Sequence, residues 1–153
     1  MTTLDSIPIT TAVGKLTAID PAYMKLPIRD GFNWDEVFAQ VGEGQWYLVV
    51  FRSRHSSNAD EVQLTEFDDR AREAALTAPG YIHYFAGTPS ADGDCLSFCL
   101  WESAAHAKSA ARLDAHVAAT TLVNYYAYYQ LERWNLSKSY QREGVNVMFE
   151  RLL

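Results

Sequence analysis

The chain has 153 residues, of which 48% are hydrophobic and 21% charged, so it is long enough for one domain with a sizeable core and is not a disordered protein. Its formal net charge of −6 argues against a nucleic-acid surface and an anionic membrane as partners, because clustered Lys and Arg recognise both. No apolar run reaches the ~18 residues of a membrane span, and no basic-then-apolar signal peptide opens the chain, so we expect a cytoplasmic protein.

Residues 1–45 are predicted to form an N-terminal arm. Prolines at positions 8, 21 and 27 favour an extended or turn-rich path through this segment. A short amphipathic helix is expected near its end, with Asn33 as a candidate N-cap and a glycine at 42 or 44 as its stop. The apolar stripe of this helix consists of Trp34, Val37, Phe38 and Val41.

Residues 46–153 alternate between strand and helix patterns. The predicted strands cover residues 46–53, 81–87, 95–101 and 125–134, a further strand is expected in 144–153, and the predicted helices cover 60–78 and 102–123. The order is β-α-β-β-α-β, which is typical of a ferredoxin-like α+β fold with one antiparallel sheet and two helices on one face.

The two cysteines lie in the strand predicted at 95–101. Cys95 and Cys99 are four residues apart, which is ~13 Å along a strand at ~3.3 Å per residue. A disulfide needs Cα atoms within ~7 Å, and one metal ion cannot bridge the larger gap either. We therefore expect two small buried side chains rather than a disulfide, a redox pair or a zinc site.

The other face of this strand carries Leu96, Phe98 and Leu100. Helices cover only one face of a ferredoxin-like sheet, so this face is predicted to be apolar and uncovered. A large exposed apolar patch marks an interface, and a homodimer that packs two sheets face to face is the simplest way to bury it.

Several short motifs together resemble the antibiotic-biosynthesis monooxygenase-like family over residues 46–134. They are Pro79-Gly80 after the first helix, Trp101-Glu102-Ser103 at the end of a strand, and His116 within "LDAHVAA". The resemblance implies a dimeric α/β barrel with a pocket between helices and sheet. It also implies one of several activities, because the superfamily includes cofactor-free oxygenases, haem-degrading enzymes, haem-dependent dehydratases, isomerases, cyclases and members without known activity.

The resemblance also assigns roles to particular residues. Trp101 corresponds to the tryptophan that lines the pocket of oxygenase members. His116 matches a histidine near the end of the second helix in many non-haem members, whereas neither His116 nor His106 fits the position of the haem ligand cleanly. The first strand lacks the asparagine of several oxygenase relatives, which places direct transfer of their mechanism in question.

His106 and His116 are the main acid–base candidates from the residues themselves. On one continuous helix both lie on the sheet-facing stripe, ~15 Å apart along the axis, so they cannot share a metal ion. Each could act alone as a general base or as a haem ligand, or could be a partly buried structural histidine.

Other candidates come from the strands. Arg52 could hold a carboxylate or phenolate at the pocket mouth. Strict alternation places His83 with Tyr81 and Phe85, and leaves open which face meets the pocket. Contacts with a ligand are predicted for His83, Tyr84, Ser97, Phe67 and Tyr128.

The sequence therefore predicts a small-metabolite enzyme, foremost a cofactor-independent monooxygenase acting on an aromatic or polyketide-like substrate. Its expected catalytic residues are His116, His106, Trp101 and Arg52. The alternatives are a haem-binding enzyme that uses His106 or His116, a cyclase, isomerase or dehydratase, and a non-catalytic ligand-binding dimer. No nucleotide, nicotinamide or zinc motif occurs in the sequence, so no metal is predicted.

Overall fold

A computed structural model describes residues 6–139 and 147–153. Within them the centre is a five-stranded antiparallel sheet in the order β2-β3-β1-β4-β5. The strands are β1 (Gly44–His55), β2 (Tyr81–Phe85), β3 (Asp94–Trp101), β4 (Tyr126–Lys138) and β5 (Met148–Leu152). The α-helices are α1 (Ile9–Ala12), α2 (Trp34–Phe38), α3 (Glu61–Leu76), α4 (Ala104–Ala111) and α5 (Asp114–Thr120), and 3-10 turns cover Val13–Lys15, Tyr23–Lys25, Ile28–Asp30 and Val123–Tyr125. The predicted ferredoxin-like arrangement is confirmed, and β5 is the extra strand expected in the tail.

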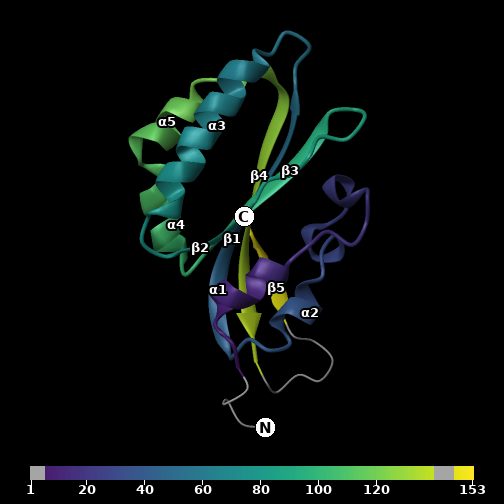
Figure 1. Cartoon of the computed structure of the whole chain (residues 1–153), viewed down its shortest axis with the longest axis vertical. Coiled ribbons are helices and arrows are strands. Elements are labelled where there is room, and N and C mark those ends of the chain that lie inside the picture. The colour runs from purple at the N-terminus through teal and green to yellow at the C-terminus, as the bar shows by residue number, and fades with distance from the viewer. Residues whose placement is uncertain (1–5, 140–146) are drawn as a thin grey trace.

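Helices α3, α4 and α5 gather on one side of the sheet (Figure 1). Asp60 caps α3, since its carboxylate accepts a hydrogen bond from the backbone N–H of Gln63 at 3.0 Å. Pro79-Gly80 follows the end of α3, as predicted, and Gly80 turns the chain with a φ of 81°. No helix in the described part of the chain is long and apolar enough to cross a bilayer.

The helix predicted over 102–123 is not continuous. It divides into α4 and α5 at Leu113, whose backbone is extended with ψ of 143°. Arg112 ends α4 through a hydrogen bond from its N–H to the carbonyl of Ser109. Neither Gly nor Pro marks this break in the sequence. The prediction of a common stripe for His106 and His116 assumed one continuous helix, and that assumption is wrong.

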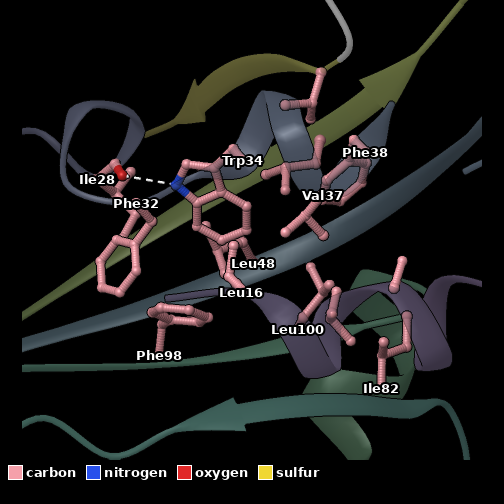
Figure 2. Packing of buried hydrophobic residues seen from close by; sticks show 14 of the residues in the cluster. Leu16, Ile28, Phe32, Trp34, Val37, Phe38, Leu48, Ile82, Phe98 and Leu100 are labelled. Carbon is pink, nitrogen blue, oxygen red and sulfur yellow. Dashed lines mark hydrogen bonds between the residues drawn. The ribbon is translucent and has the colours of Figure 1, made fainter. Parts of the chain in front are cut away.

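The N-terminal arm covers the sheet face that the sequence predicted to be free. Trp34, Phe32 and Leu16 of the arm pack against Phe98 and Leu100 in one buried cluster (Figure 2). Trp34 is 2% exposed, and its indole N–H donates a hydrogen bond to the carbonyl of Ile28 at 2.9 Å. The apolar face is thus buried within a single chain, and the expected reason for a face-to-face dimer is absent.

Two cationic side chains hold the arm on the sheet. The Arg52 guanidinium donates to the carbonyls of Met24 and Leu26, at 2.9 and 2.8 Å, and pairs with Glu132 at 2.5 Å. The ammonium group of Lys138 donates to two backbone carbonyls at the end of α2. These contacts stabilise backbone groups that α2 and the arm's turns leave unpaired.

Helix α2 appears where its apolar stripe predicted it, but Asn33 does not cap it through its side chain. The Asn33 amide oxygen instead accepts a hydrogen bond from the backbone N–H of Thr17 at 2.7 Å. Asn33 therefore connects two parts of the arm, and the sequence indicated its position but not its partner.

Two register shifts break the strict alternation that the sequence analysis assumed. One lies in β2 between Tyr81 and His83, and the other lies where β4 pairs with the Arg54-His55 end of β1. The first places Tyr84 with Tyr81 on the helix-facing side, while Phe85 joins the arm-facing core. A bulge inserts one extra residue and so reverses the facing of every residue beyond it.

Candidate functional site

The helix-facing side of the sheet carries a cluster of tyrosines near the start of β4. The second register shift pairs Tyr126 with His55 and Tyr129 with Ser53, so both tyrosines lie on this face. Their ring centroids are 5.1 Å apart, and the ring of Tyr126 is 5.2 Å from that of His55. Phe51 extends the group, with its ring centroid 6.3 Å from Tyr129. The cluster is thus an aromatic surface with several hydroxyl groups.

Asp68 of α3 is an exposed residue that interacts electrostatically with these tyrosines. It is four residues after the buried Leu64 and seven before the buried Ala75, so it occupies the sheet-facing stripe of the helix. Partial burial raises the pKa of its carboxyl above the ordinary value, while the nearby His55 opposes this increase. Asp68 also interacts electrostatically with Tyr126. A carboxyl in this setting gains basicity relative to a fully hydrated aspartate.

Burial also raises the pKa values of the tyrosines. The pKa of Tyr84 is raised to about 12, mainly by burial, and a hydrogen-bonding contact with Ser97 partly opposes the increase. Burial raises the pKa of Tyr126 and of Tyr129 further still, and Asp68 adds to both increases. All three phenols therefore stay neutral at pH 7 and can donate hydrogen bonds to an oxyanion.

Polar pairs border this group on the β1–α3 side. The Nδ1 atom of His55 lies 2.7 Å from the Glu61 carboxylate, and the Tyr125 hydroxyl lies 3.5 Å from the Gln63 side chain. The His55–Glu61 pair orients the imidazole beside Tyr126. We define Asp68, Tyr84, Tyr126, Tyr129 and His55 as the tyrosine–aspartate cluster.

Two predicted residues adjoin this cluster without completing it. Ser97 pairs with Phe51 on the same face, and its hydroxyl accepts a hydrogen bond from the N–H of Gly87 at 3.2 Å. Trp101 also lies on this face but is only 3% exposed. Its indole N–H donates to the sulfur of Cys99 at 3.0 Å, so Trp101 serves as packing in the described structure.

Phe67 and the cysteines have limited roles. Phe67 is half-buried on α3, and the Arg70 guanidinium lies 5.8 Å from its ring centroid. Both cysteines are free thiols on the helix-facing side, as predicted, and burial raises the pKa of Cys99 to about 12. Such a thiol is unreactive at neutral pH.

Three predicted residues lie on the opposite face. Arg52 holds the arm there, so its guanidinium contacts arm carbonyls and Glu132 rather than a pocket mouth, where it was predicted to hold a ligand. His83 lies beside Phe98 of the arm-facing core, with ring centroids 6.4 Å apart, and burial lowers its pKa. Tyr128 donates a hydrogen bond to Asp94 at 2.7 Å. Arg52 and Tyr128 reach this face by regular alternation, whereas the bulge in β2 separates His83 from Tyr81.

His106 lies in a different place from the tyrosine–aspartate cluster. Its Nδ1 atom is 2.7 Å from the Ser103 hydroxyl, which caps α4, and its ring packs on Gly80. A groove of about 340 Å³ beside it is lined by Ala74, Thr77, Ala78, Pro79, Ser109, Ala110 and Leu113. These contacts hold the ring against backbone through its Nδ1 side, and its role as a base or haem ligand stays a prediction.

The other haem candidate, His116, belongs to α5, but its side chain lies outside the described part of the structure. Its role as a base or ligand stays a prediction. Among the residues that are described, no group of three or more His, Cys, Asp or Glu side chains is placed to hold a metal ion.

The sequence analysis did not identify Asp68, Tyr126 and Tyr129 as site residues. Asp68 had a visible signal, since a carboxylate stands on the stripe defined by Leu64 and Ala75. The two tyrosines had none, because their shared face depends on a bulge that no Gly or Pro marks.

Comparison with solved structures shows that the chain shares the ferredoxin-like fold with several of them. A candidate antibiotic biosynthesis monooxygenase from Nitrosomonas europaea matches with a TM-score of 0.52 and 13% identity, covering 65% of this chain and 95% of that one. Protein SO0527 from Shewanella oneidensis matches with a TM-score of 0.52 and 11% identity, covering 61% of this chain and 94% of that one. A candidate monooxygenase from Lactobacillus acidophilus matches with a TM-score of 0.52 and 10% identity, covering 59% of this chain and 44% of that one. At these identities the likeness shows the fold.

The chain itself belongs to the PB2B2.08-like family, whose model matches residues 2–149. That match includes the arm as well as the sheet. No curated protein matches the sequence.

Proposed function

We propose that this protein is a small-metabolite enzyme, and that it acts as a cofactor-independent monooxygenase on an aromatic or polyketide-like substrate. The observation that supports this proposal is the tyrosine–aspartate cluster on the helix-facing side of the sheet. There, a carboxylate of raised pKa lies among three neutral phenols. The fold shared with candidate monooxygenases is consistent with this reaction class.

In this proposal Asp68 removes the proton from a phenol or enol of the substrate. The hydroxyls of Tyr84 and Tyr126 donate hydrogen bonds to the resulting oxyanion. The substrate anion then supplies electrons to O₂, so that one oxygen atom enters the product and the other leaves as water. His116 remains an alternative base from the resemblance.

Isomerisation or cyclisation is the second candidate. The pairing of Asp68 with neutral tyrosines supports it specifically, because proton removal and oxyanion stabilisation are all that an enolisation needs. We further propose a cytoplasmic homodimer with a small aromatic ligand as its partner. The free, buried thiols are consistent with a reducing compartment.

The test compares Asp68→Asn with Asp69→Asn, because Asp69 is the adjacent exposed aspartate on the same helix and Asp68 is the one that interacts with the tyrosines. Oxygen uptake and products are measured with 1,5-dihydroxynaphthalene and related naphthols, in air and under argon, and 2-naphthol binding is followed by fluorescence. We expect Asp68→Asn to lower kcat/KM by about 10²- to 10⁴-fold and Asp69→Asn to leave it unchanged.

The dependence on pH has a definite sign. Asp68 acts as a base only when ionised, and its raised pKa means that protonation begins at a higher pH than for an aspartate of ordinary pKa. We therefore expect kcat/KM to fall as pH decreases through this raised pKa. Turnover under argon would replace oxygenation with isomerisation or cyclisation, whereas saturable binding without product would contradict both enzyme proposals.

A further inference from the structure

Arg72 is a charged residue beside the tyrosine–aspartate cluster to which the proposed chemistry assigns no role. It lies on α3 four residues after Asp68, which is ~6 Å along the helix axis at ~1.5 Å per residue. Its guanidinium carbon is 5.8 Å from the centroid of the Tyr84 ring. The Tyr84 hydroxyl in turn contacts Ser97 within the cluster. Arg72 therefore lies over β2 at one end of the cluster.

The positive charge of Arg72 acts on the tyrosines of β2. It partly opposes the increase that burial causes in the pKa of Tyr81 and of Tyr84. Asp68 has the opposite effect on the pKa of Tyr84, and it also acts on the tyrosines of β4. Tyr84 is thus influenced by a carboxylate and by a guanidinium, which occupy different places along α3.

The guanidinium of Arg72 has no hydrogen-bond or ion-pair partner among the described residues. Asp68 and Asp69 stand four and three residues before it, where opposite charges on a helix ordinarily pair, yet neither forms an ion pair with it. By contrast, Arg70 of the same helix pairs with Glu66. The N–H donors of Arg72 are therefore available to a ligand.

We propose that Arg72 binds a carboxylate of the substrate, so that the ligand of this site is a hydroxylated aromatic acid whose hydroxyl lies near Asp68. The inference rests on the function proposed above and names its substrate class. A guanidinium binds a carboxylate through two parallel hydrogen bonds, and the Tyr84 ring beside it offers an aromatic surface. One cation matches one carboxylate better than a phosphate dianion in a chain whose net charge is already −6.

The two charges on α3 also determine which end of such a substrate meets the base. Arg72 attracts the substrate carboxylate, whereas the Asp68 carboxylate repels it. An acid whose hydroxyl and carboxylate lie at opposite ends of two fused rings satisfies both charges. A carboxylate next to the reacting hydroxyl would instead come close to Asp68. Arg72 is thus a residue that determines specificity and orientation, while Asp68 removes the proton.

Equilibrium binding tests this preference without any turnover. The ligands are 6-hydroxy-2-naphthoate and its neutral amide, 6-hydroxy-2-naphthamide, and their fluorescence gives the dissociation constants. We expect the wild type to bind the acid about tenfold more tightly than the amide at low ionic strength, because a charge-assisted pair forms only with the acid. Arg72→Gln should weaken binding of the acid alone and so remove the preference, and Arg72→Lys should keep part of it.

Arg70→Gln is the matched control for Arg72→Gln. It removes the same charge from an exposed position on the same helix. The change in net charge of the protein is therefore identical in the two variants. We expect Arg70→Gln to leave the ratio of the two dissociation constants unchanged.

The other outcomes separate this inference from the proposed function. Equal binding of acid and amide by the wild type overturns the role of Arg72 and leaves the proposed reaction intact. Equal loss of the preference in Arg72→Gln and Arg70→Gln does the same. Loss of amide binding in Arg72→Gln would give Arg72 a structural role and would also reject the inference. Failure of the wild type to bind either compound contradicts the proposed aromatic ligand, and this inference with it.

Discussion

At the residue scale, the position of each functional group depends on short departures from regular structure. Tyr126 and Tyr129 share a face only because one extra residue is inserted between them relative to β1. The same kind of shift places Tyr84 on the face of Tyr81. A bulge costs a ladder hydrogen bond locally, and here it orients two aromatic side chains towards one carboxylate, Asp68.

Gly80 is the residue whose replacement the structure constrains most clearly. Its φ is 81°, and a Cβ atom there would lie 2.2 Å from Cγ of His106. We expect Gly80→Ala to lower the free energy of unfolding by about 2–4 kcal/mol, since strain and overpacking add. Gly14→Ala, where no atom lies within 4 Å of the added Cβ, is the control.

Urea denaturation of the double variant Gly80→Ala/His106→Ala separates the two causes. Removing the imidazole should recover the overpacking part and leave the backbone cost of about 1–2 kcal/mol. Equal losses in Gly80→Ala and Gly14→Ala would show that the close approach to His106 is not a constraint.

At the element scale, the arm is held by packing and by a few cation–carbonyl contacts. Arg52 reaches two arm carbonyls and Glu132 at once, and Lys138 reaches the end of α2. The sequence placed Arg52 at the polar end of an apolar strand and gave it a ligand-binding role. Its real partners are backbone groups at sequence separations of 26 and 28, which no local pattern reveals.

Arg52→Ala should therefore loosen the arm. The substitution leaves Glu132 and two carbonyls of the arm without their partner, and we expect the free energy of unfolding to fall by about 2–4 kcal/mol. Urea denaturation measures this change, and limited proteolysis should cut the arm faster. Arg70→Ala removes an exposed pair with Glu66 and should cost at most about 0.5 kcal/mol. Similar losses of unfolding free energy in both variants would show that Arg52 does not hold the arm on the sheet.

At the scale of the whole molecule, the arm and the sheet share one buried cluster. Trp34 of the arm and Leu48 and Phe98 of the sheet belong to it. An N-terminal arm up to residue 45 and a domain from residue 46 were predicted from composition, and β1 begins at Gly44. The shared core means that neither part buries its apolar surface alone.

We therefore expect the chain to unfold as one cooperative unit. Variants that keep only Trp34 or only Trp101 as fluorophore, with the other tryptophans replaced by Phe, report separately on the arm side and the helix side. Their urea transitions should share one midpoint after correction for each variant's stability. An earlier transition for Trp34 would show that the arm leaves before the sheet unfolds.

The sequence by itself determined the order of strands and helices, the ferredoxin-like class, the free thiols and the end of α3 at Pro79-Gly80. These properties follow from local periodicity, spacing and turn chemistry. Only the tertiary structure decided that the arm covers the apolar face, that α4 and α5 separate at Leu113, and that Asp68 meets the tyrosines. Those outcomes depend on register shifts and on packing between segments far apart in the chain, and local sequence patterns carry no information about either.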